Sequence, residues 1–143
     1  MTLMLIIIMT SVILLSVLVN LTMLKTYYTE KEKKAIKESY CEIQKVFKKD
    51  TVRKNDVDEI AKKYNYRIMI NDSTGQNVYS SEGEKSFMYK NLWNILNNNL
   101  DRISNEISKQ GYAVMTNSNK SIGTSINLIG YLEDDYTVII STP

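Results

Sequence analysis

The first 24 residues form an apolar stretch, Met1 to Leu24, that no charged side chain interrupts. Its polar residues are Ser, Thr and one Asn, and the hydroxyl groups can return hydrogen bonds to carbonyl groups of their own helix. A helix needs about 20 apolar residues to cross the hydrocarbon core of a bilayer. The pattern therefore predicts a transmembrane helix over residues 1–24.

A cleaved signal peptide is the alternative to this anchor. Such peptides have a basic start, a shorter apolar core and a cleavage site of small residues. The present segment has no Lys or Arg at its start, and no such site follows it. An uncleaved, single-pass anchor in the cell membrane is therefore favoured. The lysines just after the span weakly favour a cytoplasmic side for the rest of the chain: Lys25, Lys31, Lys33, Lys34 and Lys37.

Helical periodicity continues over residues 27–49. Its apolar seam has a spacing of four, three and four, close to the 3.5-residue period of a coiled coil, and consists of Ile36, Tyr40, Ile43 and Phe47. The favoured interpretation is a helix that packs this seam against its own domain. The alternative is a parallel homodimer through the 27–49 helix.

Two further helices are predicted. The first covers residues 56–64, where apolar residues recur at i, i+3, i+4 and i+7 from Val57, and Asn55 or Asp56 is suited to cap it. The second covers residues 87–110 and ends at Gly111. Three consecutive asparagines, 97–99, have poor helix propensity and are expected to fray or kink its middle.

The remaining segments alternate as strands do. A hairpin is predicted over residues 66–80, with one buried face on its first strand and a turn at 72–75. A three-stranded meander follows over residues 112–142, with turns at 118–123 and 133–135. The fold class is thus α+β: a transmembrane helix, then a long helix and a five-stranded antiparallel sheet with packed helices, in one domain of residues 25–143.

Composition excludes several functions. The chain has 18 basic and 16 acidic residues and no histidine, so neither a nucleic-acid partner nor a histidine base or metal ligand is expected. The acidic clusters at 58–59 and 133–135 suit capping and turn roles, and Cys41, beside the apolar seam, is interpreted as a small hydrophobic residue. No catalytic residue, cofactor or metal site is predicted.

The hairpin of residues 67–81 carries a D-x-x-G turn at Asp72 and Gly75, and the chain ends in the strand-like segment 136–143. Together with the preceding membrane helix and long helix, these segments resemble the extracytoplasmic sensor domain of bacterial two-component sensor histidine kinases, a PAS-like (PDC or Cache-like) domain. The resemblance implies a membrane-anchored sensory domain on the outer side of the membrane.

The resemblance also implies a pocket between sheet and helices for an unknown small ligand, or contact with an envelope protein. Its candidate residues are Arg67, Tyr79, Tyr112 and Tyr131. The kinase core with its histidine and ATP-binding domain has no counterpart in these residues, so this chain is not expected to be an enzyme. The alternative function is a membrane-tethered envelope interaction protein without a signalling role.

Overall fold

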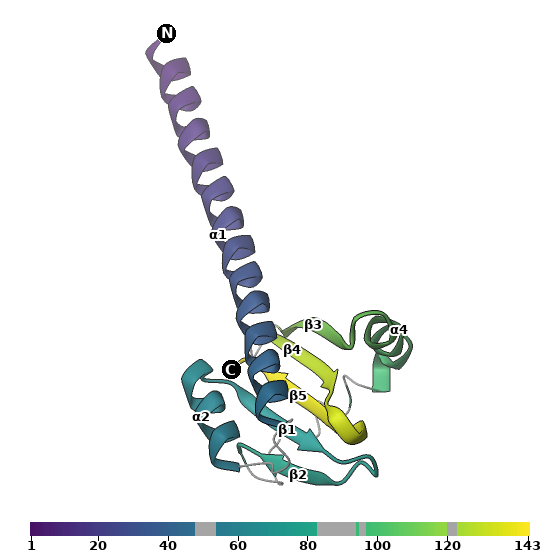
Figure 1. The fold of residues 1–143 in the computed structure, drawn as a ribbon. Coiled ribbons are helices and arrows are strands. Elements are labelled where there is room, and N and C mark those ends of the chain that lie inside the picture. Colours follow the sequence, from purple (N-terminus) through teal and green to yellow (C-terminus); the bar gives the residue numbers. More distant parts are fainter. Residues whose placement is uncertain (48–53, 83–93, 95–96, 120–122) are drawn as a thin grey trace. The chain divides into compact units, whose positions relative to one another are not determined.

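The structure is a computed structural model, and it describes residues 1–47, 54–82, 94, 97–119 and 123–143. These residues divide into two compact units, Met1–Lys34 and Ala35–Pro143. The elements along the chain (Figure 1) are α1 (Thr2–Phe47), α2 (Lys54–Tyr64), β1 (Arg67–Asn71), β2 (Asn77–Ser80), α4 (Leu100–Gln110), β3 (Tyr112–Asn119), β4 (Gly123–Tyr131) and β5 (Thr137–Ser141), with a short 3₁₀ turn at Glu133–Asp135.

The unit of residues 1–34 consists of the first part of helix α1. Its apolar side chains are exposed, and the helix is long and apolar enough to cross a membrane, either as a span or as a signal anchor. Hydroxyl groups in this segment donate to carbonyl oxygens of the preceding turn, as Thr10 Oγ1 does to Ile6 O at 2.8 Å. A long apolar N-terminal helix is therefore confirmed.

The last part of α1 belongs to the second unit. Ile36, Tyr40 and Ile43 are buried in the main core, which confirms that the helix packs its seam against its own domain. Because these seam residues contact the core of their own domain, a homodimer through the 27–49 helix would have to use another face of that helix. Cys41, predicted to be a small hydrophobic residue beside the seam, is exposed, because one residue from Tyr40 is about 100° around the helix and away from the seam.

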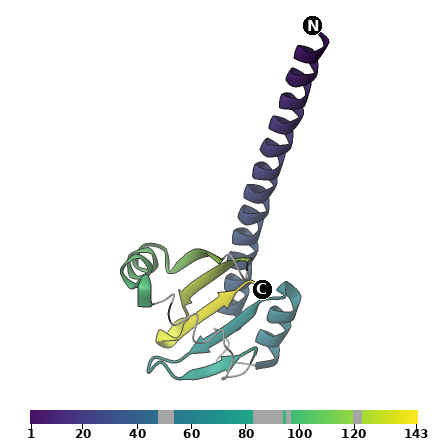
Figure 2. The same ribbon diagram turned by 180° about the vertical axis from the view of Figure 1, so that it is seen from behind.

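The sheet is antiparallel and five-stranded, with the order β2-β1-β5-β4-β3. The predicted five-stranded antiparallel sheet is thus confirmed. Strands β1 and β5, the first and last along the chain, pair in the middle of the sheet, where Ile68 lies opposite Ile140 and Ile70 opposite Val138. Figure 2 shows the sheet from behind, with α4 beside β3 and α2 beside β1.

Both faces of the sheet are covered. One face packs on α1 and α2 through the larger core, and the other carries a second cluster that α4 joins through Ile103 and Ile107. The prediction that the first strand has one buried face is wrong, because Met69 and Asn71 are buried on its second side. Met69 packs in the same cluster as Ile103 of α4. The alternation of residues along one strand does not reveal that a helix covers its second face.

The turn of the first hairpin forms as predicted. Asp72 Oδ1 accepts hydrogen bonds from the backbone N–H groups of Thr74 and Gln76, both at 2.9 Å, and Gly75 has a φ of +84°. Helix α2 starts at Lys54, so Asn55 and Asp56 lie inside its first turn and do not cap it as predicted.

The helix predicted over 87–110 is described at residue 94 and from residue 97 onwards, because residues 83–93 and 95–96 lie outside the described part. Asn99 has a non-helical φ of −128° at the start of α4, which agrees with the predicted break at the asparagines. Gly111 ends α4 as predicted, with a φ of +84° and its N–H donating to Ile107 O at 2.8 Å. Strands β3 and β4 extend into the predicted turn at 118–123, of which residues 120–122 are not described.

Candidate functional site

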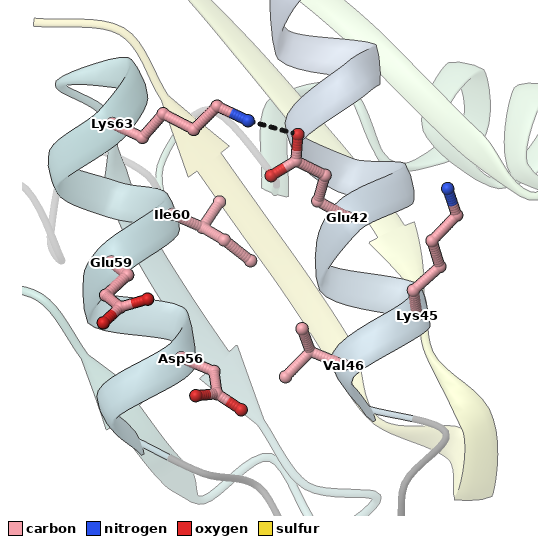
Figure 3. Close-up of a pocket in the computed structure, with 7 residues that line it drawn as sticks. All are labelled: Glu42, Lys45, Val46, Asp56, Glu59, Ile60 and Lys63. Carbon is pink, nitrogen blue, oxygen red and sulfur yellow. Dashed lines mark hydrogen bonds and ion pairs between the residues drawn. The ribbon is translucent and has the colours of Figure 1, made fainter.

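A cleft of about 500 Å³ lies between the end of α1 and helix α2 (Figure 3). Its lining combines an apolar base with a charged rim. The lining residues are Glu42, Lys45 and Val46 from α1 and Asp56, Glu59, Ile60 and Lys63 from α2. They belong to the unit of residues 35–143, so one folded domain carries the whole cleft.

Helical spacing explains why these side chains meet. The three residues from α1 lie at i, i+3 and i+4, and the four from α2 at i, i+3, i+4 and i+7, so each set shares one face of its helix. Ile43 and Ile60 are buried in the core beneath these faces. Burial of the apolar stripes against the sheet therefore fixes the charged residues beside them.

A small network of polar side chains joins the two helices at the cleft. Lys63 Nζ lies 2.7 Å from Glu42 Oε1, and the Tyr64 hydroxyl donates to the same oxygen at 2.8 Å. The hydrogen bond from Lys63, followed by that from Tyr64, holds the pKa of Glu42 below its ordinary value. The same bond to Glu42 raises the pKa of Lys63. The pair is solvent-exposed, so it aligns the helices more than it stabilises them.

The other charges of the cleft are available to a ligand. Lys45, Asp56 and Glu59 make no hydrogen bond or ion pair with another residue in the described part of the chain. One ammonium and two carboxylate groups around an apolar base suit a small ligand with a cationic group and an apolar body. Among the described residues, no group of three His, Cys, Asp or Glu side chains is arranged to hold a metal ion. The side chains that line the cleft include no Ser, Thr, Cys or His.

Two of the predicted pocket residues lie near the start of β1 and on β2. Arg67 forms an ion pair with Glu82, with Nε 2.7 Å from Oε1, and lines a smaller cavity of about 320 Å³. Tyr79 is buried, and its hydroxyl donates a short hydrogen bond to Asp58, which also lines that cavity. Burial first, and this hydrogen bond second, raise the pKa of Tyr79 well above its ordinary value.

The other two predicted residues lie towards the opposite edge of the sheet. The Tyr112 ring is 5.7 Å from the Tyr40 ring, and Lys37 Nζ lies 5.5 Å from the Tyr112 centroid. Tyr131 has a side chain that is 54% exposed. The structure therefore does not bring the four predicted residues into one pocket, because β1 and β5 separate β2 from the β3–β4 edge.

Tyr40 is a residue whose role the sequence reasoning missed. Its hydroxyl donates to Tyr131 O at 2.7 Å and accepts from Gln44 Nε2 at 2.9 Å, and its burial raises its pKa. Its ring lies directly against Gly130 of β4, where an added Cβ would be 2.6 Å from it. A glycine inside a strand, such as Gly130, is the sequence signal that could have indicated this close approach. Tyr40 thus ties α1 to the sheet.

A second missed feature is the buried Asn127 of β4, which is 2% exposed. Its Oδ1 accepts a hydrogen bond of 2.5 Å from Ser141 Oγ. Its Nδ2 has no hydrogen-bond partner among the residues that the structure describes. Strand alternation places Asn127 on the same face as Ile129, which is the face that α4 covers. A polar residue at an inward-facing position of a strand is the sequence signal for such a buried side chain.

No protein-family model, curated protein or solved structure matches this chain. The α+β fold, the apolar helix and the cleft between α1 and α2 are therefore the grounds for assigning a function.

Proposed function

We propose that this chain is the membrane-anchored sensory domain of a two-component sensor histidine kinase, with a PAS-like domain on the outer side of the cell membrane. The D-x-x-G hairpin resembles that family, and a long helix followed by a five-stranded antiparallel sheet is the architecture that the resemblance implies. The observation that carries the proposal is that one helix, α1, includes both the apolar segment and residues that line the cleft.

Signal input is assigned to the cleft between α1 and α2. A ligand there contacts Glu42, Lys45 or Val46 on α1 and the facing residues of α2. A ligand changes the position of α1 only if it binds two arrangements of these helices with different affinity. Such a change reaches the membrane segment through the backbone of the same helix, as a small tilt or a shift along its axis.

The coding sequence beyond Pro143 tests the kinase part of this proposal. The expected result is an in-frame continuation with a second apolar helix, a histidine-bearing helix and a nucleotide-binding domain. A stop codon followed by an unrelated gene contradicts the proposal and favours a membrane-tethered interaction protein.

The side of the membrane is tested through Cys41, the one cysteine of the chain, which is exposed on α1. A membrane-impermeant maleimide should label it in intact cells, and Cys41→Ser should abolish labelling. As a matched control, a cysteine in a short polar extension added before Met1, in the Cys41→Ser background, should react only after permeabilisation. The reverse pattern would place the domain in the cytoplasm and contradict the proposal.

A further inference from the structure

The two ends of the cleft between α1 and α2 differ in charge. At one end Lys63 Nζ lies 2.7 Å from Glu42 Oε1, so two opposite charges already neutralise each other. At the other end Asp56 and Glu59 of α2 lie one helical turn apart on the same face of the helix (Figure 3). Neither of these two carboxylates makes a hydrogen bond or an ion pair within the described ranges. This end of the cleft therefore carries uncompensated negative charge.

The wall of the cleft beside these carboxylates is apolar. Val46 of α1 and Ile60 of α2 point towards each other across the cleft (Figure 3). Ile60 is buried in the main core, and Val46 packs against that core. The remaining cation of the lining, Lys45, has its ammonium group on the side of α1 that faces away from α2. A ligand between the helices therefore meets two unpaired carboxylates and an apolar wall.

We propose that this cleft binds a small molecule with one ammonium group on an apolar body, and that Asp56 and Glu59 hold the ammonium group. An ammonium group has three N–H donors, so it can donate charge-assisted hydrogen bonds to both carboxylates. The apolar body covers Val46 and Ile60 and removes their exposed surface from water. A volume of about 500 Å³ is within the range of small-molecule sites. That binding acts as a signal rests on the proposed function, which assigns signal input to the same cleft.

Asp56 has a second role from which ligand binding must be separated. It lies in the first turn of α2, where a carboxylate also complements the positive end of the helix dipole. Asp101 has the same position in α4, is exposed and does not line the cleft. Neutralising Asp101 therefore changes the net charge and a helix end in the same way as neutralising Asp56, but leaves the cleft intact. This makes Asp101→Asn a matched control for Asp56→Asn.

The test titrates phenethylammonium into the full chain in phosphatidylcholine nanodiscs and measures the heat of binding, with the heat from empty nanodiscs subtracted. Phenethyl alcohol lacks the charge and methylammonium lacks the apolar body, so each should bind about 10-fold more weakly than phenethylammonium.

The variants locate the binding site. Asp56→Asn should weaken phenethylammonium binding about 5-fold, which corresponds to about 1 kcal/mol, the upper range for an exposed ion pair. Adding Glu59→Gln to this variant should bring the loss to about 20-fold, since both carboxylates contact the same ammonium group. Asp101→Asn should bind like the wild type.

The inference is overturned if the wild type does not bind phenethylammonium, if phenethyl alcohol binds equally well, or if Asp56→Asn and Asp101→Asn show the same affinity. The comparison of the probes uses wild-type protein alone, so it decides the question even where a variant is unstable. The coding sequence beyond Pro143 reports separately on the proposed function. Binding that depends on Asp56, together with a stop codon there, keeps the ligand site and removes the kinase. A kinase continuation without binding removes only the ligand site.

Discussion

Replacing Gly130 by alanine tests the contact that ties α1 to the sheet. An alanine Cβ at this position would lie 2.6, 2.7 and 2.8 Å from Cε2, Cζ and the hydroxyl oxygen of Tyr40. Favourable contact between carbon atoms begins near about 3.5 Å, so one of the two groups must move. The Tyr40 ring is buried and held by its hydrogen bond to Tyr131 O, and moving it breaks that bond.

Overpacking of this kind typically costs about 1–3 kcal/mol, and the loss of backbone freedom in the unfolded chain returns about 0.4–1 kcal/mol. We therefore expect Gly130→Ala to lower the free energy of unfolding by about 1–2 kcal/mol. With a urea m-value of about 1–2 kcal/mol/M, the midpoint should fall by about 1 M. The assay is urea unfolding of the full chain in mild detergent, followed by far-ultraviolet circular dichroism.

A double-mutant cycle with Tyr40→Leu identifies the cause. Leucine lacks the ring atoms and hydroxyl that an alanine at 130 would meet. In the Tyr40→Leu background, Gly130→Ala should therefore cost less than about 0.5 kcal/mol, and the coupling should account for most of the single-mutant effect. An equal cost in both backgrounds would refute the packing of Tyr40 against Gly130.

Three further predictions concern other contacts. Tyr79→Phe should lower the free energy of unfolding by about 1.5–3 kcal/mol, because it leaves the Asp58 carboxylate without its hydrogen-bond donor. The pKa of Tyr79 is raised, so the stability that Tyr79 contributes is present below its ordinary pKa of 10.0 and is lost as pH rises through the pKa of the folded state. In an ultraviolet absorbance titration the substitution should remove a late-titrating phenol, and an unchanged titration would contradict this contact. The pKa of Glu42 is lowered, so the stability that Glu42 contributes is present above its ordinary pKa of 4.5 and is lost as pH falls through the pKa of the folded state. The stability difference between the wild type and Glu42→Gln should therefore shrink on acidification. A difference in urea midpoint that stays constant with pH would argue against the network with Lys63 and Tyr64. Gly111→Ala should lower stability by about 1 kcal/mol, because its φ of +84° suits glycine, whereas Ser108→Ala on the exposed side of α4 should have little effect.

Local sequence patterns were sufficient for several elements of this protein. The apolar stretch 1–24 predicted a helix able to span a membrane, and the seam of Ile36, Tyr40 and Ile43 predicted a helix packed on its own domain. Asp72 and Gly75 predicted the hairpin turn, and Gly111 the end of a helix. Each of these features depends on residues within a few positions of one another, so the chain itself carries the information. Membership of a sensor family remains a proposal.

Only the tertiary structure decided how these elements meet. Pairing of β1 with β5 brings Ile68 opposite Ile140, and the second covered face of the sheet buries Met69, which a strand alternation assigned to solvent. Tyr40 bonds to Tyr131 across 91 residues of chain. The cleft likewise forms because Glu42 on α1 meets Lys63 on α2. Periodicity reports which side of an element is apolar. Which elements share a surface depends on the packing of the whole chain. That packing also keeps the four predicted pocket residues from lining a single pocket.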